Sequence, residues 1–154
     1  MRPGPALARG FTLVELMVVL AVIAVAGTAV LLTQPGDQQR LSREAERFGA
    51  RLVRAQEEAI LGTRSIQVVA SEQGYAFARQ RFAQWEPLVE RPFGDVAWEQ
   101  GTLPRLTRDL PEVRFDFDPS GIASPAALVL TRGHSTMQVS VDAEGKVTVD
   151  APRG

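Results

Sequence analysis

The chain has 154 residues and a formal net charge of −1, so it is long enough for one domain plus an anchoring segment and has no overall basic bias. It contains no cysteine, which excludes disulfides, thiolate metal sites and cysteine nucleophiles. Its one histidine, His134, cannot by itself form a multi-histidine metal site. We therefore expect no metal site and no cofactor.

The first elements in chain order are a short basic leader and a long apolar segment. Residues 1–10 include Arg2 and Arg9, and residues 11–32 are almost entirely apolar. A helix of that length covers about 33 Å, which is enough for a bilayer core of about 30 Å. Positive charges before such a segment favour the cytoplasmic side, so the remainder of the chain is expected outside the cytoplasm.

Neither of two ordinary explanations fits this segment fully. A secretory signal peptide has a shorter apolar core, followed by a small-residue cleavage site that is not evident here. A plain signal anchor explains the length and the flanks but does not explain Glu15, an acid inside the apolar run. At the centre of a span a carboxylate costs about 2.5–3.5 kcal/mol on insertion scales, so an intramembrane acid indicates a function and needs a partner.

The sequence RGFTLVEL of residues 9–16 resembles the cleavage and methylation motif of prepilins. The resemblance implies that a prepilin peptidase cuts between Gly10 and Phe11 on the cytoplasmic side and that the new N-terminal Phe11 is N-methylated. It also implies that Glu15 acts in assembly. The freed amine of Phe11 is a cation, and Glu15 can pair with an amine inside a filament that excludes water. Because an unpaired buried charge is very costly, this pairing would set the axial register of each added subunit.

A second helix is predicted after the apolar segment. Pro35 and Gly36 should loosen the chain there, Asp37 can cap the new helix, and Gly62 can end it. One helical face is apolar, at the spacings of three and four that indicate a core stripe: Leu41, Ala45, Phe48, Leu52, Ala55 and Ala59. Charged residues lie off this face: Arg40, Arg43, Glu44, Arg47, Arg51, Arg54 and Glu58. They form either a basic face for DNA or a solvated face opposite the core, and we favour the second interpretation.

After Gly62 the apolar period changes from about 3.6 to 2, which predicts strands. Residues 65–70 and 75–82 are expected to form a hairpin around a turn at 71–74. Residues 84–111 hold several prolines and glycines and are expected to form a long loop with short edge strands. Its Trp85, Phe93 and Trp98 are either loop anchors or an interaction surface, with anchors favoured. Further strands are predicted at 113–117, 127–131, 137–141 and 146–149, separated by turns at 118–121, 132–135 and 142–145.

These elements predict an α+β fold in which a long N-terminal helix packs on a C-terminal antiparallel β-sandwich, with the helix against one face. The stretch FDPSG at 117–121, followed by Ser124, Pro125 and two terminal strands, resembles the C-terminal region of H-type minor pseudopilins of type II secretion, the GspH family, and of related minor type IV pilins. The implied organisation is a cleaved leader at 1–10, a transmembrane and assembly helix at 11–34, an amphipathic half-helix at 35–62 and a periplasmic β-rich domain at 63–154.

This second resemblance implies a structural subunit at or near the tip of a short periplasmic filament, the pseudopilus, that helps to export folded proteins across the outer membrane. The implied partners are the other minor pseudopilins, the major pseudopilin, the inner-membrane secretion platform and the prepilin peptidase. The implied location is the bacterial inner membrane, with a single pass, the N-terminus in the cytoplasm and the C-terminal domain in the periplasm.

Other chemistry is weakly supported. His134 and Ser135 with an aspartate could form a triad, but they lie in a predicted turn and no nucleophile elbow is present. Four acids could gather a calcium ion, but without EF-hand spacing: Asp116, Asp118, Asp142 and Glu144. We expect no enzyme and no catalytic residue. The alternative function is a minor type IV pilin for pilus assembly or DNA uptake, which the 15 basic and 17 acidic residues from Gly36 onward do not favour.

Overall fold

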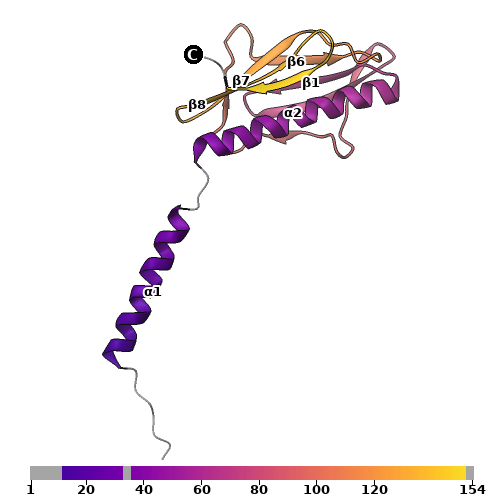
Figure 1. Ribbon diagram of the computed structural model, residues 1–154. Helices are drawn as coiled ribbons and strands as arrows, with labels where there is room; N and C mark the ends of the chain where they lie inside the picture. Colours follow the sequence, from indigo (N-terminus) through magenta and orange to yellow (C-terminus); the bar gives the residue numbers. More distant parts are fainter. Residues whose placement is uncertain (1–11, 33–35, 152–154) are drawn as a thin grey trace, which may run out of the picture. The chain divides into compact units, whose positions relative to one another are not determined.

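The structure, a computed structural model, describes residues 12–32 and 36–151 (Figure 1). The chain divides into two compact units, Met1–Pro35 and Gly36–Gly154. In the first unit, helix α1 runs from Leu13 to Leu32. Over the part of the chain that the structure describes, no helix is both long enough and apolar enough to cross a membrane. Pro35, which we expected to loosen the chain, lies outside the described residues.

Helix α2, Asp37–Gly62, carries the predicted core stripe. All six apolar side chains of that stripe are completely buried. The helix ends at Gly62 as predicted, but the left-handed residue that closes it is Thr63, with φ of 50°. The amide of Arg64 donates to the carbonyl oxygen of Ala59 at 3.1 Å, which satisfies one of the last free carbonyls of the helix.

The predicted role of Asp37 as the N-cap of this helix is wrong. The N-cap is Gly36, and no side chain caps the helix. Asp37 is the first helical residue, and its carboxylate pairs with Arg132 at 3.2 Å. The carboxylate is attracted to a guanidinium that is largely buried, and a buried charge requires a partner more strongly than an exposed helix end does.

The second unit contains two antiparallel sheets (Figure 1). The first has the strand order β3-β2-β1-β6, with β4 also paired to β2, and the second has the order β5-β7-β8-β9. The first sheet comprises β1 (Ile66–Ser71), β2 (Gly74–Arg81), β3 (Gln84–Pro87), β4 (Val96–Ala97) and β6 (Glu112–Phe117). The second comprises β5 (Leu103–Pro104), β7 (Ala126–Arg132), β8 (Ser135–Val141) and β9 (Val147–Asp150). The predicted hairpin and the later strands are thereby confirmed within one or two residues. The short strands β3, β4 and β5 lie in the segment 84–111, where short edge strands were expected without stated bounds.

One core joins α2 to both sheets. The helix contacts β1 and β6 of the first sheet and β7, β8 and β9 of the second. The strands alternate as predicted, so that Phe115 and Phe117 of β6 and Val139 of β8 point into the core. The predicted fold class is confirmed: an N-terminal helix packed on an antiparallel β-sheet domain.

The long segment between β2 and β6 is fastened by aromatic side chains. Trp98 is buried, packs edge-on to Phe48 with ring centroids 5.3 Å apart, and donates from Nε1 to the carbonyl oxygen of Ser71 at 2.9 Å. Phe93 packs on Phe77 at 5.3 Å. These two residues are loop anchors, whereas Trp85 remains 42% exposed.

We expect residues 36–154 to fold alone as a soluble domain. The buried residues of the common core all lie from Leu41 onward, so removal of residues 1–35 leaves that core complete. A chain truncated before Gly36 should be monomeric and should unfold cooperatively with urea. Persistent aggregation, or a gradual loss of structure without a transition, would show that the domain needs its N-terminal helix.

Candidate functional site

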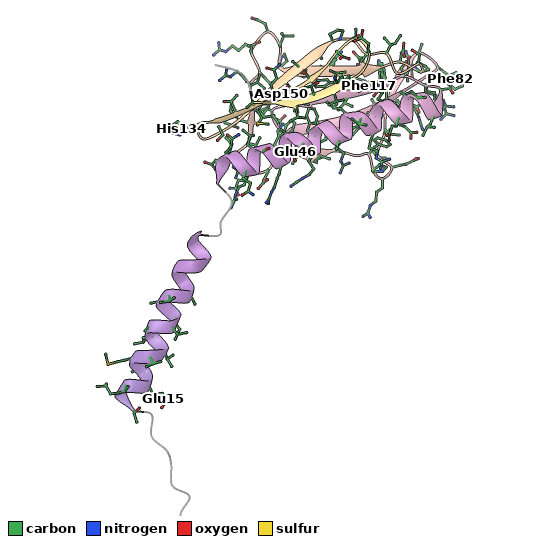
Figure 2. All side chains as sticks on the ribbon, in the orientation of Figure 1. Glu15, Glu46, Phe82, Phe117, His134 and Asp150 are labelled. Atoms are coloured by element: carbon green, nitrogen blue, oxygen red, sulfur yellow. The ribbon has the colours of Figure 1, made fainter. Side chains whose placement is uncertain are left out.

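Glu15 lies in the first turn of α1, as the third residue of the helix (Figure 2). The Glu15 amide donates to the side-chain oxygen of Thr12 at 3.3 Å, and the Leu16 amide donates to the Thr12 carbonyl oxygen at 3.2 Å. Thr12 thus accepts a free amide of the first turn, in the spacing of a capping box. The carboxylate is also favoured there because the start of a helix carries partial positive charge.

The surface of α1 around this carboxylate is apolar and exposed. The large apolar side chains from Leu13 to Val25 are 44–76% exposed, and Glu15 is the one charged residue in the α1 sequence. A helix that is apolar on all sides is stable when lipid or other helices surround it. In such surroundings the Glu15 carboxylate loses its water, so a cation or strong donors must replace it.

The structure places only part of the predicted processing site. Gly10 and Phe11 lie outside the described residues, whereas Glu15 lies within them. The cut after Gly10, the methylation of Phe11 and the pairing of Glu15 with an amine therefore stay predictions.

For one acid of the second unit, Glu44, the position predicted from the sequence pattern is wrong. Glu44 was expected off the core face of its helix, but only 7% of it is exposed. One carboxylate oxygen accepts a hydrogen bond from the Glu99 amide, and the other accepts one from the Thr102 hydroxyl, each at 2.5 Å. Glu44 is three residues after Leu41 and four before Phe48, so it borders the apolar stripe, and this spacing was the available signal.

Arg132 extends this group of polar side chains to the second sheet. Its guanidinium donates to the Thr102 hydroxyl at 3.2 Å and to Asp37 at 3.2 Å, and the residue is 9% exposed. Charge-assisted hydrogen bonds of this kind are stronger than neutral ones. They fix the start of α2 to the end of β7 and to the loop before β5.

The remaining arginines of α2 lie on the outside of the helix. Arg51 donates to the Pro92 carbonyl oxygen, and Arg54 pairs with Glu57 at 3.2 Å. Arg43 and Arg47 are exposed and make no hydrogen bond or ion pair with the described chain. Arg47 and Arg51 are still near enough to Tyr75 to act on its pKa, which burial of the ring raises and the two arginines partly lower.

The acids considered for calcium are used in local structure. Asp118 Oδ1 accepts from the Ser120 hydroxyl, the Ser120 amide and the Ile122 amide, and the hydroxyl contact is the main reason why the pKa of Asp118 is lowered. Asp142 accepts the Lys146 amide at 2.8 Å in the turn before β9. Asp116 accepts from Gln67 at 2.6 Å. Each of these three carboxylates stabilises a turn or a strand pair.

Of the residues considered for a triad, His134 lies in the turn between β7 and β8, and Ser135 is the first residue of β8. Arg132 and Ser135 pair across the hairpin, and Gly133 has φ of 54°, a conformation that favours glycine. Figure 2 shows His134 at the opposite end of the domain from Phe82. No described carboxylate hydrogen-bonds to His134, so the described residues do not assemble a triad there.

Two family models match the chain. The model of the type II transport protein GspH matches residues 44–145, and the model of the prokaryotic N-terminal methylation motif matches residues 6–31. The pilin-like protein PilA1 of Thermus thermophilus is 30% identical in an alignment that covers 92% of this chain and 98% of the relative.

Solved structures of low identity share the fold. The minor pseudopilin EPSH of Vibrio cholerae has a TM-score of 0.62 at 16% identity, over 77% of this chain and 99% of that one. GspH of Escherichia coli has a TM-score of 0.60 at 17% identity, over 76% and 93%. The type IV minor pilin FimU of Pseudomonas aeruginosa has a TM-score of 0.52 at 15% identity, over 73% and 92%.

Proposed function

This chain belongs to the type II transport protein GspH family, and we infer that it is a minor pseudopilin of the type II secretion system. It is a structural subunit at or near the tip of the periplasmic pseudopilus, and it helps to export folded proteins across the outer membrane. Its role is assembly, without a bond made or broken by the subunit itself.

The observation that carries this inference is the order of two matches in one chain. The methylation motif at 6–31 is followed by the GspH match at 44–145. The motif and the family imply a membrane-anchored protein with a periplasmic domain. In support, α1 has an apolar surface on every side for which side chains are described, and α2 with its sheets forms a separate unit.

The finer organisation follows from the motif. Residues 1–10 form the leader that a prepilin peptidase removes, and residues 11–34 form the membrane and assembly helix. Residues 35–62 form the amphipathic half of the helix, and residues 63–154 form the periplasmic β-rich domain. The chain crosses the bacterial inner membrane once, with its N-terminus in the cytoplasm.

Pseudopilins assemble with one another, so other pseudopilins are the partners of this chain. The specific ones are the remaining minor pseudopilins, the major pseudopilin and the inner-membrane secretion platform. Glu15 pairs with the methylated amine of Phe11, in its own chain or in a neighbour. Ion pairing removes the cost of leaving either charge alone among apolar helices.

We expect processing after Gly10. In cells with an active prepilin peptidase, mass spectrometry of the membrane-extracted protein should find an N-methylated Phe11 at the N-terminus. A Gly10→Leu variant should keep its leader, because a bulky side chain is placed next to the bond that is cut. An intact Met1 terminus on the unchanged protein would contradict the proposal.

The system in which the subunit works can be tested by deletion of its gene. For a secretion pseudopilin, exported proteins should accumulate in the periplasm, and the full chain supplied in trans should restore their release. PilA1 is a pilin-like protein and FimU is a type IV minor pilin. The alternative role in pilus assembly or DNA uptake is therefore tested by measuring surface pili and DNA uptake in the same strain. Normal secretion together with a loss of pili or of DNA uptake would replace the secretion role with a pilus role.

A further inference from the structure

We propose that one face of α2 binds the anionic phospholipid headgroups of the membrane that anchors the chain. We call it the arginine face, and it consists of Arg40, Arg43, Arg47, Arg51 and Arg54. These residues follow one another at spacings of three, four, four and three, so they lie along one side of the helix. The inference rests on the proposed function, because it needs a membrane-anchored chain.

The centre of the arginine face is available for a ligand. Arg43 and Arg47 are exposed and have no hydrogen bond or ion pair within the described chain. The acids of α2 are placed elsewhere: Asp37 pairs with Arg132, and Glu44 is buried. Glu46 accepts a hydrogen bond from Ser42 on an adjacent face, and Glu57 and Glu58 are near the C-terminal end. The positive charges of Arg43 and Arg47 are therefore not paired with any acid of α2.

Chain connectivity keeps this charge close to the end of α1. α1 ends at Leu32 and α2 begins at Asp37, and the five Cα–Cα steps between these two residues span at most about 18 Å. If α1 is held in a bilayer, α2 starts within that distance of its end. Binding of the headgroups is then an intramolecular event with a high effective concentration, so the bound state is populated even if the attraction is weak. Each arginine near an anionic bilayer surface adds about fivefold to binding.

A tethered surface suits this face better than a polyanion in solution. From Gly36 onward the chain has 15 basic and 17 acidic residues, and this balance opposes the capture of a free nucleic acid. Short-range contact with headgroups depends on the local face, because charges farther away than about 8–10 Å are screened at physiological salt.

The absence of cysteine allows a clean test with single labels. Ala50 is exposed and lies between Arg47 and Arg54 on the helix surface, so Ala50→Cys carries a fluorophore on the arginine face. Ala143→Cys, in the exposed turn before β9, carries the reference fluorophore. The full chain is reconstituted into vesicles whose lipids carry a headgroup quencher. One set contains phosphatidylcholine alone, and the other contains one-third phosphatidylglycerol.

We expect at least threefold more quenching at Ala50→Cys with phosphatidylglycerol than without it, and little change at Ala143→Cys. Salt at 0.5 M should reduce the difference. Arg43→Gln with Arg47→Gln should remove most of it, because the two arginines without partners are lost. Arg105→Gln with Arg108→Gln removes the same charge from exposed residues of the loop after β5 and should leave it unchanged. Circular dichroism checks that each variant is folded.

Equal quenching in the two lipids, or an effect that survives Arg43→Gln with Arg47→Gln, would overturn the inference. Quenching that does not depend on phosphatidylglycerol, but is relieved by duplex DNA or an acidic protein, would also overturn it. That result would assign the arginine face to a soluble partner. Flotation of the vesicles separates this from failure of the proposed function. A chain that floats without quenching at Ala50→Cys contradicts the inference alone, whereas a chain that does not float contradicts the anchoring and both proposals.

Discussion

Replacement of Glu15 by leucine should give a subunit that is inserted and cut but does not enter the filament. Insertion should persist or improve, because an acid in an apolar segment opposes transfer into lipid. Cleavage should persist, because the proposed cut after Gly10 is made at a bond that the substitution leaves unchanged. Incorporation should fail, because the amine of Phe11 or of a neighbouring subunit loses its counter-ion. An unpaired buried charge costs about 3–5 kcal/mol, which is at least a hundredfold in an assembly equilibrium.

The measurement is co-purification of Glu15→Leu with the other minor pseudopilins, together with a secretion assay. Thr12→Val is the matched control, since it removes the hydrogen bond to the Glu15 amide but leaves the carboxylate in place. Loss of that bond should cost about 0.5–2 kcal/mol of helix stability, with assembly retained. If Glu15→Leu assembles and secretes normally, the carboxylate has no assembly role.

Replacement of Phe48 by alanine should cause the largest loss of stability in the domain, about 3–5 kcal/mol. Phe48 is completely buried. Its ring centroid lies 4.7 Å from that of Tyr75, 5.3 Å from Trp98 and 5.6 Å from Phe115, so one side chain joins α2 to the first sheet and to the long loop. The cavity would remain largely open, because neighbours held by hydrogen bonds, such as Trp98, cannot move in to fill it.

The measurement is urea denaturation of the full chain in detergent micelles, followed by tryptophan fluorescence. Phe82→Ala is the matched control, because it deletes the same atoms from a side chain that is 91% exposed. Its effect should stay within about 0.5 kcal/mol. Equal losses for the two variants would show that Phe48 is not central to the core.

The sequence by itself determined the features that depend on near neighbours. The motif at 9–16 and the apolar run after it are continuous stretches, and their interpretation needs no other part of the chain. The stripe from Leu41 to Ala59 and the alternation of Met137, Val139 and Val141 follow from helix and strand periods. The turns at 118–121 and 142–145 follow from Asp and Gly, whose side-chain bonds and permitted dihedrals act within four residues.

The turn between β2 and β3 was not predicted, because it lacks the residues that usually form such turns. The second strand was expected to include Phe82, but β2 ends at Arg81, and Phe82 and Ala83 form the turn into β3 with φ of 49° and 64°. Two-residue turns of this kind usually contain asparagine and glycine, because other residues adopt positive φ at a cost of roughly 1–2 kcal/mol each. The pairing of β2 with β3 compensates for this cost, and the sequence around the turn does not reveal that pairing.

Only the tertiary structure decided which distant groups meet. Glu44 bonds to residues 55 and 58 positions away, and Asp37 pairs with Arg132, 95 positions away. In the first sheet β1 lies between β2 and β6, and in the second the two-residue β5 pairs with β7. A local pattern records whether a side chain is apolar, whereas a buried carboxylate depends on whether donors from other elements reach it. That is why the core stripe could be predicted, while the acid beside it was placed on the wrong face.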